Sequence, residues 1–211
     1  LFQVRTNTMT RPNALLSPTG AALHPSYQPE RRRALSRMGG LAAGAMATLA
    51  GCSSLDPSLY ALQTPTFSLR KYFNGDLDAW GLFQDRFGKV QQRMTVAMTG
   101  TWQGSTGTLD EHFTYADGRT ERRIWTLEER EGGQSVGTAS DVIGQAQGQA
   151  HGNALHWRYT LALPIQGRVW HVDVDDWMFL IDERILLNRA RMSKWGLTLG
   201  EVFLSFSRRS V

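Results

Sequence analysis

The chain has 211 residues, a single cysteine and a formal net charge of +4. The basic excess lies in residues 1–51, which hold six Arg and one Glu, so residues 52–211 carry 17 basic and 18 acidic side chains. This near-neutral balance removes the electrostatic argument for a nucleic-acid-binding protein. The 160 residues after position 51 suffice for one domain with a hydrophobic core, and one cysteine excludes an intrachain disulfide.

Residues 31–52 have the pattern of an export signal. Arg31–Arg33 and Arg37 precede an apolar stretch, Met38–Ala50, which is shorter than the ~20 residues that a membrane-spanning helix needs. Ala50 and Gly51 stand directly before Cys52. This order resembles the signal peptide and lipobox of bacterial lipoproteins, which implies cleavage before Cys52 and acylation of its side chain. The alternative is a structural cysteine that is buried after an N-terminal helix.

The signal also predicts a location. We expect residues 1–51 to be a leader with a lipoprotein signal peptide and residues 52–66 to be a lipidated tether. Ser53 after the cysteine resembles the sorting signal of outer-membrane lipoproteins, which implies a periplasm-facing protein held on the outer membrane by its lipid. Arg32–Arg37 resembles a twin-arginine signal, and an ordinary Sec signal remains the alternative.

Residues 67–211 are predicted to form an all-β domain. Glycines interrupt every window of helical length, and the segments between them alternate between apolar and polar residues, which is typical of short antiparallel strands. About ten such strands, each with one apolar face, must close or fold over to hide their edges. We predict an antiparallel lipocalin-like β-barrel of roughly ten strands, with a two-sheet sandwich as the alternative. The segments that alternate are 90–98, 109–115, 120–129, 154–163, 168–176, 177–181, 185–188, 190–194 and 202–207.

The chain from Tyr72 to Arg208 resembles a bacterial lipoprotein family known only as domain of unknown function 3833. The resemblance rests on Tyr72-Phe73-x-Gly75, Ala79-Trp80-Gly81-x-Phe83-Gln84-Asp85-Arg86, Gly100-x-Trp102-x-Gly104, Asp175-Asp176-Trp177-Met178 and Asn188-Arg189-Ala190-x-Met192-Ser193-Lys194. The family implies no activity. Gly100-Thr101-Trp102 also resembles the G-x-W motif of lipocalin-like (calycin) barrels, although it follows two probable strands here instead of lying on the first.

The sequence offers one weak candidate for a metal site. His171, Asp173 and Asp175 share one strand face, but neighbouring side chains on such a face are ~7 Å apart, which is too far for one ion without further ligands. A solvated outer face is therefore the preferred interpretation, and we expect neither a metal nor another cofactor. Phosphate-binding glycine loops and the G-x-S-x-G motif are absent from the sequence.

Glu111 and Arg123 are the principal candidates for a binding site. Glu111 shares a strand face with Leu109 and Phe113, and Arg123 shares one with Trp125, so both charged side chains should point inward. A three-residue turn at Asp117–Arg119 would place Glu111 diagonally across from Arg123. The pair is either a structural ion pair or a polar anchor for a ligand head group.

The set of candidate ligand-binding residues is wider than this pair. Four polar residues, Asn188, Arg189, Arg191 and Lys194, either bind an anionic group near a barrel mouth or form loop ion pairs that hold strand ends, and the second interpretation is preferred. The full candidate set is Glu111, Arg123, Trp102, Trp125, Trp157, Arg189 and Lys194.

These features favour a ligand-binding lipoprotein. We expect the barrel to bind a hydrophobic or amphipathic, lipid-like molecule. One alternative is a structural lipoprotein with a solid core that acts through a protein partner. The other is a small-barrel isomerase or cyclase that uses Glu111 and Arg123, although no catalytic residue is assigned and an enzyme is the less favoured interpretation.

Overall fold

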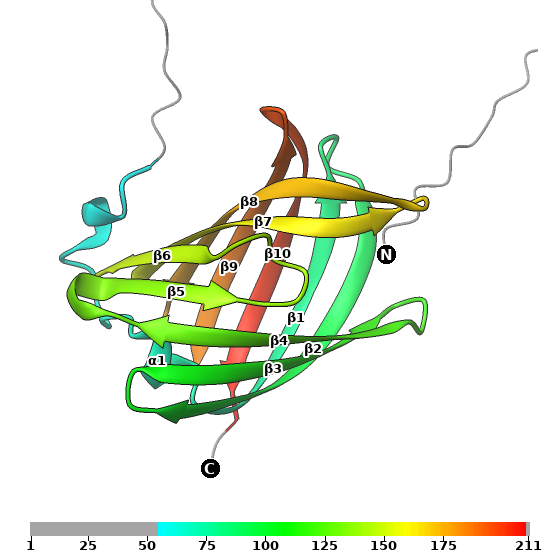
Figure 1. Ribbon diagram of the computed structural model, residues 1–211. Helices are drawn as coiled ribbons and strands as arrows, with labels where there is room; N and C mark the ends of the chain where they lie inside the picture. Colours follow the sequence, from blue (N-terminus) through cyan, green and yellow to red (C-terminus); the bar gives the residue numbers. More distant parts are fainter. Residues whose placement is uncertain (1–54, 210–211) are drawn as a thin grey trace, which may run out of the picture. The chain divides into compact units, whose positions relative to one another are not determined.

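A computed structural model describes residues 55–209, which form one closed β-barrel (Figure 1). Helical structure is limited to three short segments, two of them 3₁₀ turns. The elements are η1 (Pro57–Tyr60), α1 (Leu69–Tyr72), β1 (Gly75–Asp85), β2 (Val90–Gln103), β3 (Thr106–Tyr115), β4 (Thr120–Glu129), η2 (Glu131–Gly133), β5 (Gln134–Thr138), β6 (Ala146–His151), β7 (Ala154–Ile165), β8 (Arg168–Leu180), β9 (Ile185–Lys194) and β10 (Leu197–Arg208).

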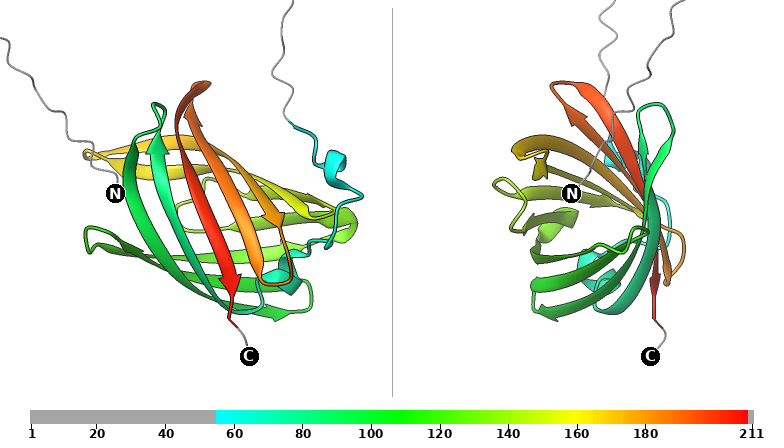
Figure 2. Two further views of the ribbon diagram at one scale, coloured as in Figure 1. Left: turned by 180° about the vertical axis from the view of Figure 1, so that it is seen from behind. Right: turned by 90° about the vertical axis from the view of Figure 1, so that its right-hand side faces the viewer.

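Each strand pairs with the next one along the chain in antiparallel orientation. β10 then pairs with β1, from Leu77 opposite Arg208 to Asp85 opposite Gly200, and this pairing closes the barrel. Figure 2 shows β10 between β1 and β9 when the barrel is seen from behind. Closure leaves none of the ten strands with a free edge, because every strand has two neighbours. The predicted all-β, lipocalin-like barrel is confirmed, and the two-sheet sandwich is wrong.

The strand boundaries differ from the sequence prediction in two ways. Residues 168–180 form one strand, as do residues 185–194, although each was expected to be divided. The inward side chains in these strands include Asp176 and Asn188, and these polar residues interrupted the apolar alternation on which the prediction depended. β1, β5 and β6 were not predicted individually because glycine and small residues weaken their alternation.

The residues just before β1 close one end of the barrel. α1 and its neighbours Phe67 and Phe73 are buried against the core at the end where β2 turns into β3 and β8 into β9. The Tyr72 hydroxyl donates a hydrogen bond to the Arg184 carbonyl (2.9 Å), and Trp102 Nε1 donates one to the Phe73 carbonyl (2.9 Å). Residues 67–73 therefore form a plug at this end, and the two bonds fix the plug to two different parts of the barrel wall.

The opposite end of the barrel carries the turns that follow the odd-numbered strands. In an up-and-down barrel the turns β1–β2, β3–β4, β5–β6, β7–β8 and β9–β10 all lie at one end. They lie toward the upper right of Figure 1, whereas α1 lies at the lower left. The plug and the open turns therefore give the two ends of the barrel different properties.

The segment before the plug runs along the outer wall. The Tyr60 ring packs edge-on against Trp177 and Phe179, with ring centroids 5.8 and 5.1 Å apart. The Phe67 amide donates a hydrogen bond to the Gly152 carbonyl (2.7 Å). Residues 55–66 of the predicted tether thus contact the barrel. The predicted leader, residues 1–51, and Cys52 lie outside the described residues.

Neither 3₁₀ turn nor α1 has the length or the apolar character of a membrane-spanning helix, within residues 55–209.

Candidate functional site

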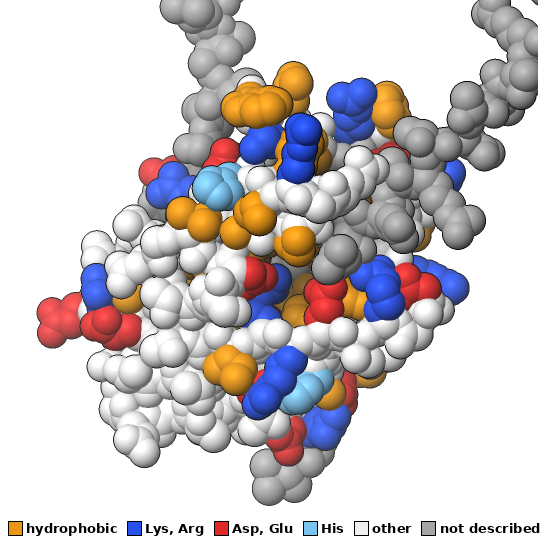
Figure 3. All heavy atoms as spheres, turned by 45° about the vertical axis from the view of Figure 1, so that its right-hand side comes forward, with side chains coloured by type: hydrophobic (Ala, Val, Ile, Leu, Met, Phe, Trp, Pro, Cys, Tyr) orange, Lys and Arg blue, Asp and Glu red, His pale blue; other side chains and the backbone are white. Residues whose placement is uncertain are grey.

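The barrel encloses a cavity of about 430 Å³. It extends from the plug residues Leu69 and Phe73 to Tyr115 and Pro164, which lie near the open turns. Figure 3 brings the right-hand side of Figure 1 forward and shows apolar side chains in a hollow that is flanked by acidic and basic side chains. The period-two alternation of the strands produces this lining, because it directs one apolar face of each strand inward. The main apolar contributors are Leu109, Phe113, Trp125, Leu155, Trp157 and Met192.

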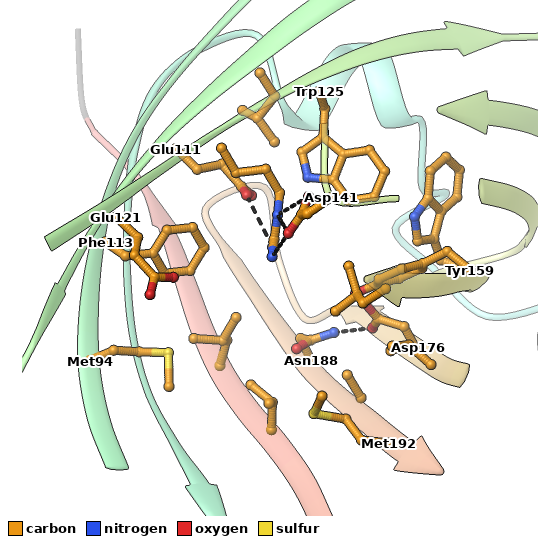
Figure 4. Close-up of a pocket in the computed structure, with 18 of the residues that line it drawn as sticks. Met94, Glu111, Phe113, Glu121, Trp125, Asp141, Tyr159, Asp176, Asn188 and Met192 are labelled. Carbon is orange, nitrogen blue, oxygen red and sulfur yellow. Dashed lines mark hydrogen bonds and ion pairs between the residues drawn. The ribbon is translucent and has the colours of Figure 1, made fainter. Parts of the chain in front are cut away.

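A three-membered ionic group projects into the cavity from one wall (Figure 4). Arg123 binds Asp141 through Nε (3.1 and 3.0 Å to the two carboxylate oxygens) and through Nη2 (2.7 Å to Oδ2). Its Nη1 lies 3.8 Å from Glu111 Oε2. Glu111 pairs directly with Arg123 in the β3–β4 ladder, so the diagonal arrangement expected from the sequence is wrong. The last ladder pair is Thr114–Thr120, so five residues, 115–119, connect the two strands, and the register is shifted by two residues relative to a three-residue turn.

Glu111 is buried, with 9% of its surface exposed. Burial raises the pKa of its carboxyl to about 7, while the positive charge of Arg123 and a hydrogen bond from Trp125 act in the opposite direction. Its Oε2 atom accepts no hydrogen bond from residues 55–209. A buried acceptor without a hydrogen-bond donor is costly, and the Arg123 nitrogen 3.8 Å away is too distant to be one.

A second acidic group lies on the facing wall, where Asp176 of β8 is buried (Figure 4). Asn188 Nδ2 donates a hydrogen bond to Asp176 Oδ1, and the Tyr159 hydroxyl lies 3.4 Å from Oδ2. Burial raises the pKa of Asp176 to about 7, with the hydrogen bonds from Asn188 and Tyr159 opposing the shift. Burial likewise raises the pKa of Tyr159 well above its ordinary value, so Tyr159 is a neutral donor.

The structure brings four of the seven candidate residues into the cavity. Glu111 and Arg123 are joined there by Trp125 and Trp157, whose rings meet edge-on with centroids 6.0 Å apart. Trp102 lies at the plugged end instead, where its indole packs over Gly107. Its role there is to seal the barrel, because its ring nitrogen holds the plug.

Arg189 and Lys194 lie away from the cavity. Arg189 is on the outer face of β9 and pairs with Glu201 (2.6 Å). Lys194 lies at the open end, where its Nζ is 4.7 Å from the Trp195 ring and 5.2 Å from that of Trp170, and donates to the His171 carbonyl (2.9 Å). Arg189 thus forms an ion pair at mid-strand on the outer face, and Lys194 contacts a carbonyl and two aromatic rings at the end of β9.

Sequence reasoning missed Asp141 and Asp176, and it placed Asn188 near a barrel mouth and not inside the cavity. Asp176 continues the inward row of Val172 and Val174, and Asn188 continues that of Leu186, so an unbroken period of two would have found both. Asp141 lies in the β5–β6 connection, and no local pattern marks it. The β4–β5 pairing and a bridge between Val142 and Leu161 of β7 hold this connection beside Arg123.

The acidic side chains on the outer face of β8, which are candidate metal ligands in the sequence, contact neighbouring side chains outside the cavity. Asp173 accepts a hydrogen bond from Thr160 (2.9 Å), and Asp175 accepts one from Trp177 Nε1 (3.1 Å). His156 Nε2 lies 3.1 Å from Asp175 Oδ2, and its ring stacks on Trp177. Within residues 55–209 no three His, Cys, Asp or Glu side chains are arranged to hold a metal ion.

Solved structures share this fold at very low sequence identity. An S-type phycobiliprotein lyase from Guillardia theta is 5% identical, covers 75% of this chain and 99% of its own, and superposes with a TM-score of 0.53. A protein of unknown function from the DUF3598 family of Nostoc punctiforme PCC 73102 is 12% identical, with a TM-score of 0.48; the match covers 70% of this chain and 51% of that one. The likeness to the lyase concerns the fold alone.

The sequence itself identifies a family. No curated protein matches the chain. A family described as protein of unknown function (DUF3833) matches residues 46–208, which include the plug, all ten strands and every residue of the two acidic groups. The chain belongs to the DUF3833 family.

Proposed function

We propose that this protein is an outer-membrane lipoprotein whose barrel binds an amphipathic, lipid-like molecule on the periplasmic side. The observation that carries the proposal is the cavity, which combines an apolar lining with a buried carboxyl oxygen that accepts no hydrogen bond from residues 55–209. Its volume of about 430 Å³ lies within the ~300–1,000 Å³ typical of small-molecule sites. The plug at one end and the turns at the other suit a ligand that enters from the open end.

The alternative of a structural lipoprotein with a solid core does not agree with this cavity. The protein from Guillardia theta, an S-type phycobiliprotein lyase, has the same general fold. At 5% identity it supports the fold of this barrel and carries no substrate over to it. The proposed ligand therefore depends on the chemistry of the cavity alone.

The anchor is proposed from the sequence and supported by its surroundings. Cys52 lies three residues before Leu55, where the described residues begin. Leu55, Leu59 and Leu62 are exposed, at 58%, 66% and 95% of their surfaces. Apolar side chains beside an acyl group add to the binding of a lipid surface.

The anchor is tested by replacing Cys52 with Ser in a bacterial host fed radiolabelled palmitate. The wild-type chain is expected to incorporate label and to sediment with outer membranes, and the variant to do neither. Label in the variant, or a wild-type chain without label, would contradict the anchor. Neither result affects the cavity proposal.

The cavity is tested with the unanchored chain, which carries Cys52→Ser and is purified without detergent. We expect native mass spectrometry to show a retained lipid-like molecule that is absent under denaturing conditions. Ala190→Phe fills the cavity from β9 and should abolish the retained mass, whereas Leu187→Phe, on the outer face of the same strand, should preserve it. An empty spectrum after incubation with envelope lipids would overturn the proposal.

A second candidate function is an isomerase or cyclase that acts on such a ligand. The observation that favours it is the pKa of about 7 at Glu111, because a carboxyl that titrates near the working pH is suited to general acid–base catalysis. Turnover of the retained molecule that Glu111→Gln abolishes, without loss of binding, would establish this activity.

A further inference from the structure

We infer that the cavity binds an amphipathic molecule whose polar group is an amine, which presents positive charge and N–H donors to Glu111 and Asp176. This inference rests on the proposed function and names the chemical class of its ligand. It follows from the balance of charge and of donors inside the barrel. Glu111 and Asp141 pair with the guanidinium of Arg123, and the carboxyl of Asp176 lines the same cavity without a cation of its own among residues 55–209.

Arg123 is already occupied and is not free to receive an anionic head group. Asp141 accepts hydrogen bonds from both Nε and Nη2 in a bidentate arrangement, with distances of 2.7 to 3.1 Å. The third nitrogen faces Glu111, and one side of the guanidinium lies 5.5 Å from the centre of the Phe113 ring. A ligand carboxylate would have to displace Asp141 from a charge-assisted pair.

The other charged groups of the lining do not alter this balance. Arg122 is directed to the outer face, where it pairs with Asp110 (2.7 Å). Nearer the open end, Glu121 accepts a hydrogen bond from the Tyr115 hydroxyl (2.9 Å) and lies 3.8 Å from Arg119. Apart from these paired groups, the cavity lining has more hydrogen-bond acceptors than donors.

One carboxyl oxygen in the cavity lacks a hydrogen-bond donor among the described residues, and a second buried carboxyl faces it. Glu111 Oε2 accepts no hydrogen bond within residues 55–209, and Asp176 faces it across the cavity (Figure 4). The charge of Glu111 contributes to the raised pKa of Asp176, so the two carboxyls interact electrostatically. An ammonium group relieves this repulsion and supplies the missing donor, whereas a carboxylate would add another negative charge.

The pH dependence of binding follows from the same groups. Glu111 and Asp176 both have a pKa of about 7, and they are faced by Arg123, Asp141 and Tyr159. An ammonium ligand favours their ionised forms, so its affinity is expected to rise as pH increases from about 6 to 8. A carboxylate ligand would show the opposite trend.

The test is displacement of a neutral fluorescent probe, N-phenyl-1-naphthylamine, from the unanchored Cys52→Ser chain. Competitors with the same alkyl chain are dodecylamine, dodecanol, dodecanoate and dodecyltrimethylammonium, used below their micelle concentrations. We expect dodecylamine to displace the probe at a concentration at least about tenfold lower than dodecanoate at pH 8, which corresponds to ~1.4 kcal/mol. The trimethylammonium compound, which has the charge without N–H donors, should fall between them.

Matched variants locate the selectivity. Glu111→Gln combined with Asp176→Asn should reduce the preference for dodecylamine over dodecanoate about tenfold and leave dodecanol within twofold. Asp173→Asn, on the outer face of β8, should change neither. If the double variant does not fold, the ranking of competitors on the unsubstituted cavity still decides the question.

The outcomes separate the inference from the proposed function. Tighter binding of dodecanoate than of dodecylamine would overturn the amine head group and leave a lipid-binding barrel. Failure of every competitor and of the probe to bind would overturn both. An amine preference that persists in the double variant would assign the selectivity to other residues and would also refute the inference.

Discussion

At the scale of single residues, the two buried carboxyls determine how stability depends on pH. Glu111 and Asp176 have ordinary pKa values of 4.5 and 3.8, and burial raises both to about 7 in the folded chain. The folded state therefore binds more protons than the unfolded state between about pH 4 and 7, and this contribution to stability is lost as pH rises through 7. The outer carboxyls with lowered pKa, such as Asp78 and Asp110, titrate below this window.

We predict that the free energy of unfolding of the wild-type chain falls as pH rises from 5 to 8. The double variant Glu111→Gln, Asp176→Asn carries no ionisable group at these positions, so its stability should vary less over the same range. Urea denaturation at pH 5, 6, 7 and 8 measures both curves. Parallel curves for the two proteins would show that the carboxyls do not titrate in this window.

Arg123 allows a second prediction at the same scale. Arg123→Met retains the length of the side chain but leaves Asp141 and Glu111 without their cation inside the cavity. We expect a loss of about 2–3 kcal/mol of unfolding free energy at pH 8 and a smaller loss at pH 5, where Glu111 is protonated.

The adjacent residue provides the control. Arg122→Met removes a bidentate pair with Asp110 on the outer face, and such exposed pairs contribute ~0–1 kcal/mol. Equal losses for Arg123→Met and Arg122→Met in urea denaturation would contradict the special role of the inner pair.

At the scale of elements, the plug is held by a close approach to β2. A Cβ atom at Gly100 would lie 1.7 Å from the Phe73 carbonyl oxygen, so only glycine lets the plug backbone reach the strand. Trp102 on the same strand donates its indole N–H to that carbonyl. Gly100 and Trp102 of the G-x-W motif thus both hold the plug. Gly100 does so because it has no side chain to block the plug backbone, and Trp102 does so through the hydrogen bond from its ring nitrogen.

We predict that Gly100→Ala displaces the plug from β2. The expected loss of stability is about 2–4 kcal/mol, because the displaced segment exposes Phe67 and Phe73, which are core residues. Thermal unfolding and proteolysis between residues 60 and 75 measure the effect. Thr95→Ala, an exposed position on the same strand, should change stability by less than about 0.5 kcal/mol. A stable, protease-resistant Gly100→Ala chain would disprove the role of this contact.

At the scale of the whole molecule, the barrel depends on pairing between the first and the last strand. β1 and β10 are joined along nine residue pairs, and β10 contributes Phe206 to the core and Val202 and Leu204 to the cavity lining. Removal of β10 would leave β1 and β9 with unpaired edges and open the core to water.

We predict that a chain ending at Gly196 does not form a soluble, cooperatively unfolding monomer. Size-exclusion chromatography and circular dichroism measure this outcome. A chain ending after Arg209 retains every strand and the Arg209–Asp78 ion pair, and it should behave as the full chain does. A folded monomer without β10 would show that the remaining nine strands can close by themselves.

The sequence by itself determined the local features of this protein. Alternation of apolar and polar residues specified an all-β chain, and the need to bury strand edges favoured a closed barrel. It also placed Glu111 and Arg123 inward, because each lies in a row of apolar residues with a period of two. The anchor at Cys52 is a prediction from sequence order alone, and it stays a prediction.

Only the tertiary structure decided what the barrel contains. Whether inward side chains fill the interior or leave a cavity depends on how strands distant in sequence interdigitate, and alternation is the same in both cases. The five-residue connection 115–119 sets Glu111 opposite Arg123, and the pairing of strands around the barrel brings Asp141 and Asp176 to the same cavity from separate parts of the chain. The ligand chemistry inferred here arises from these long-range contacts, which no local pattern encodes.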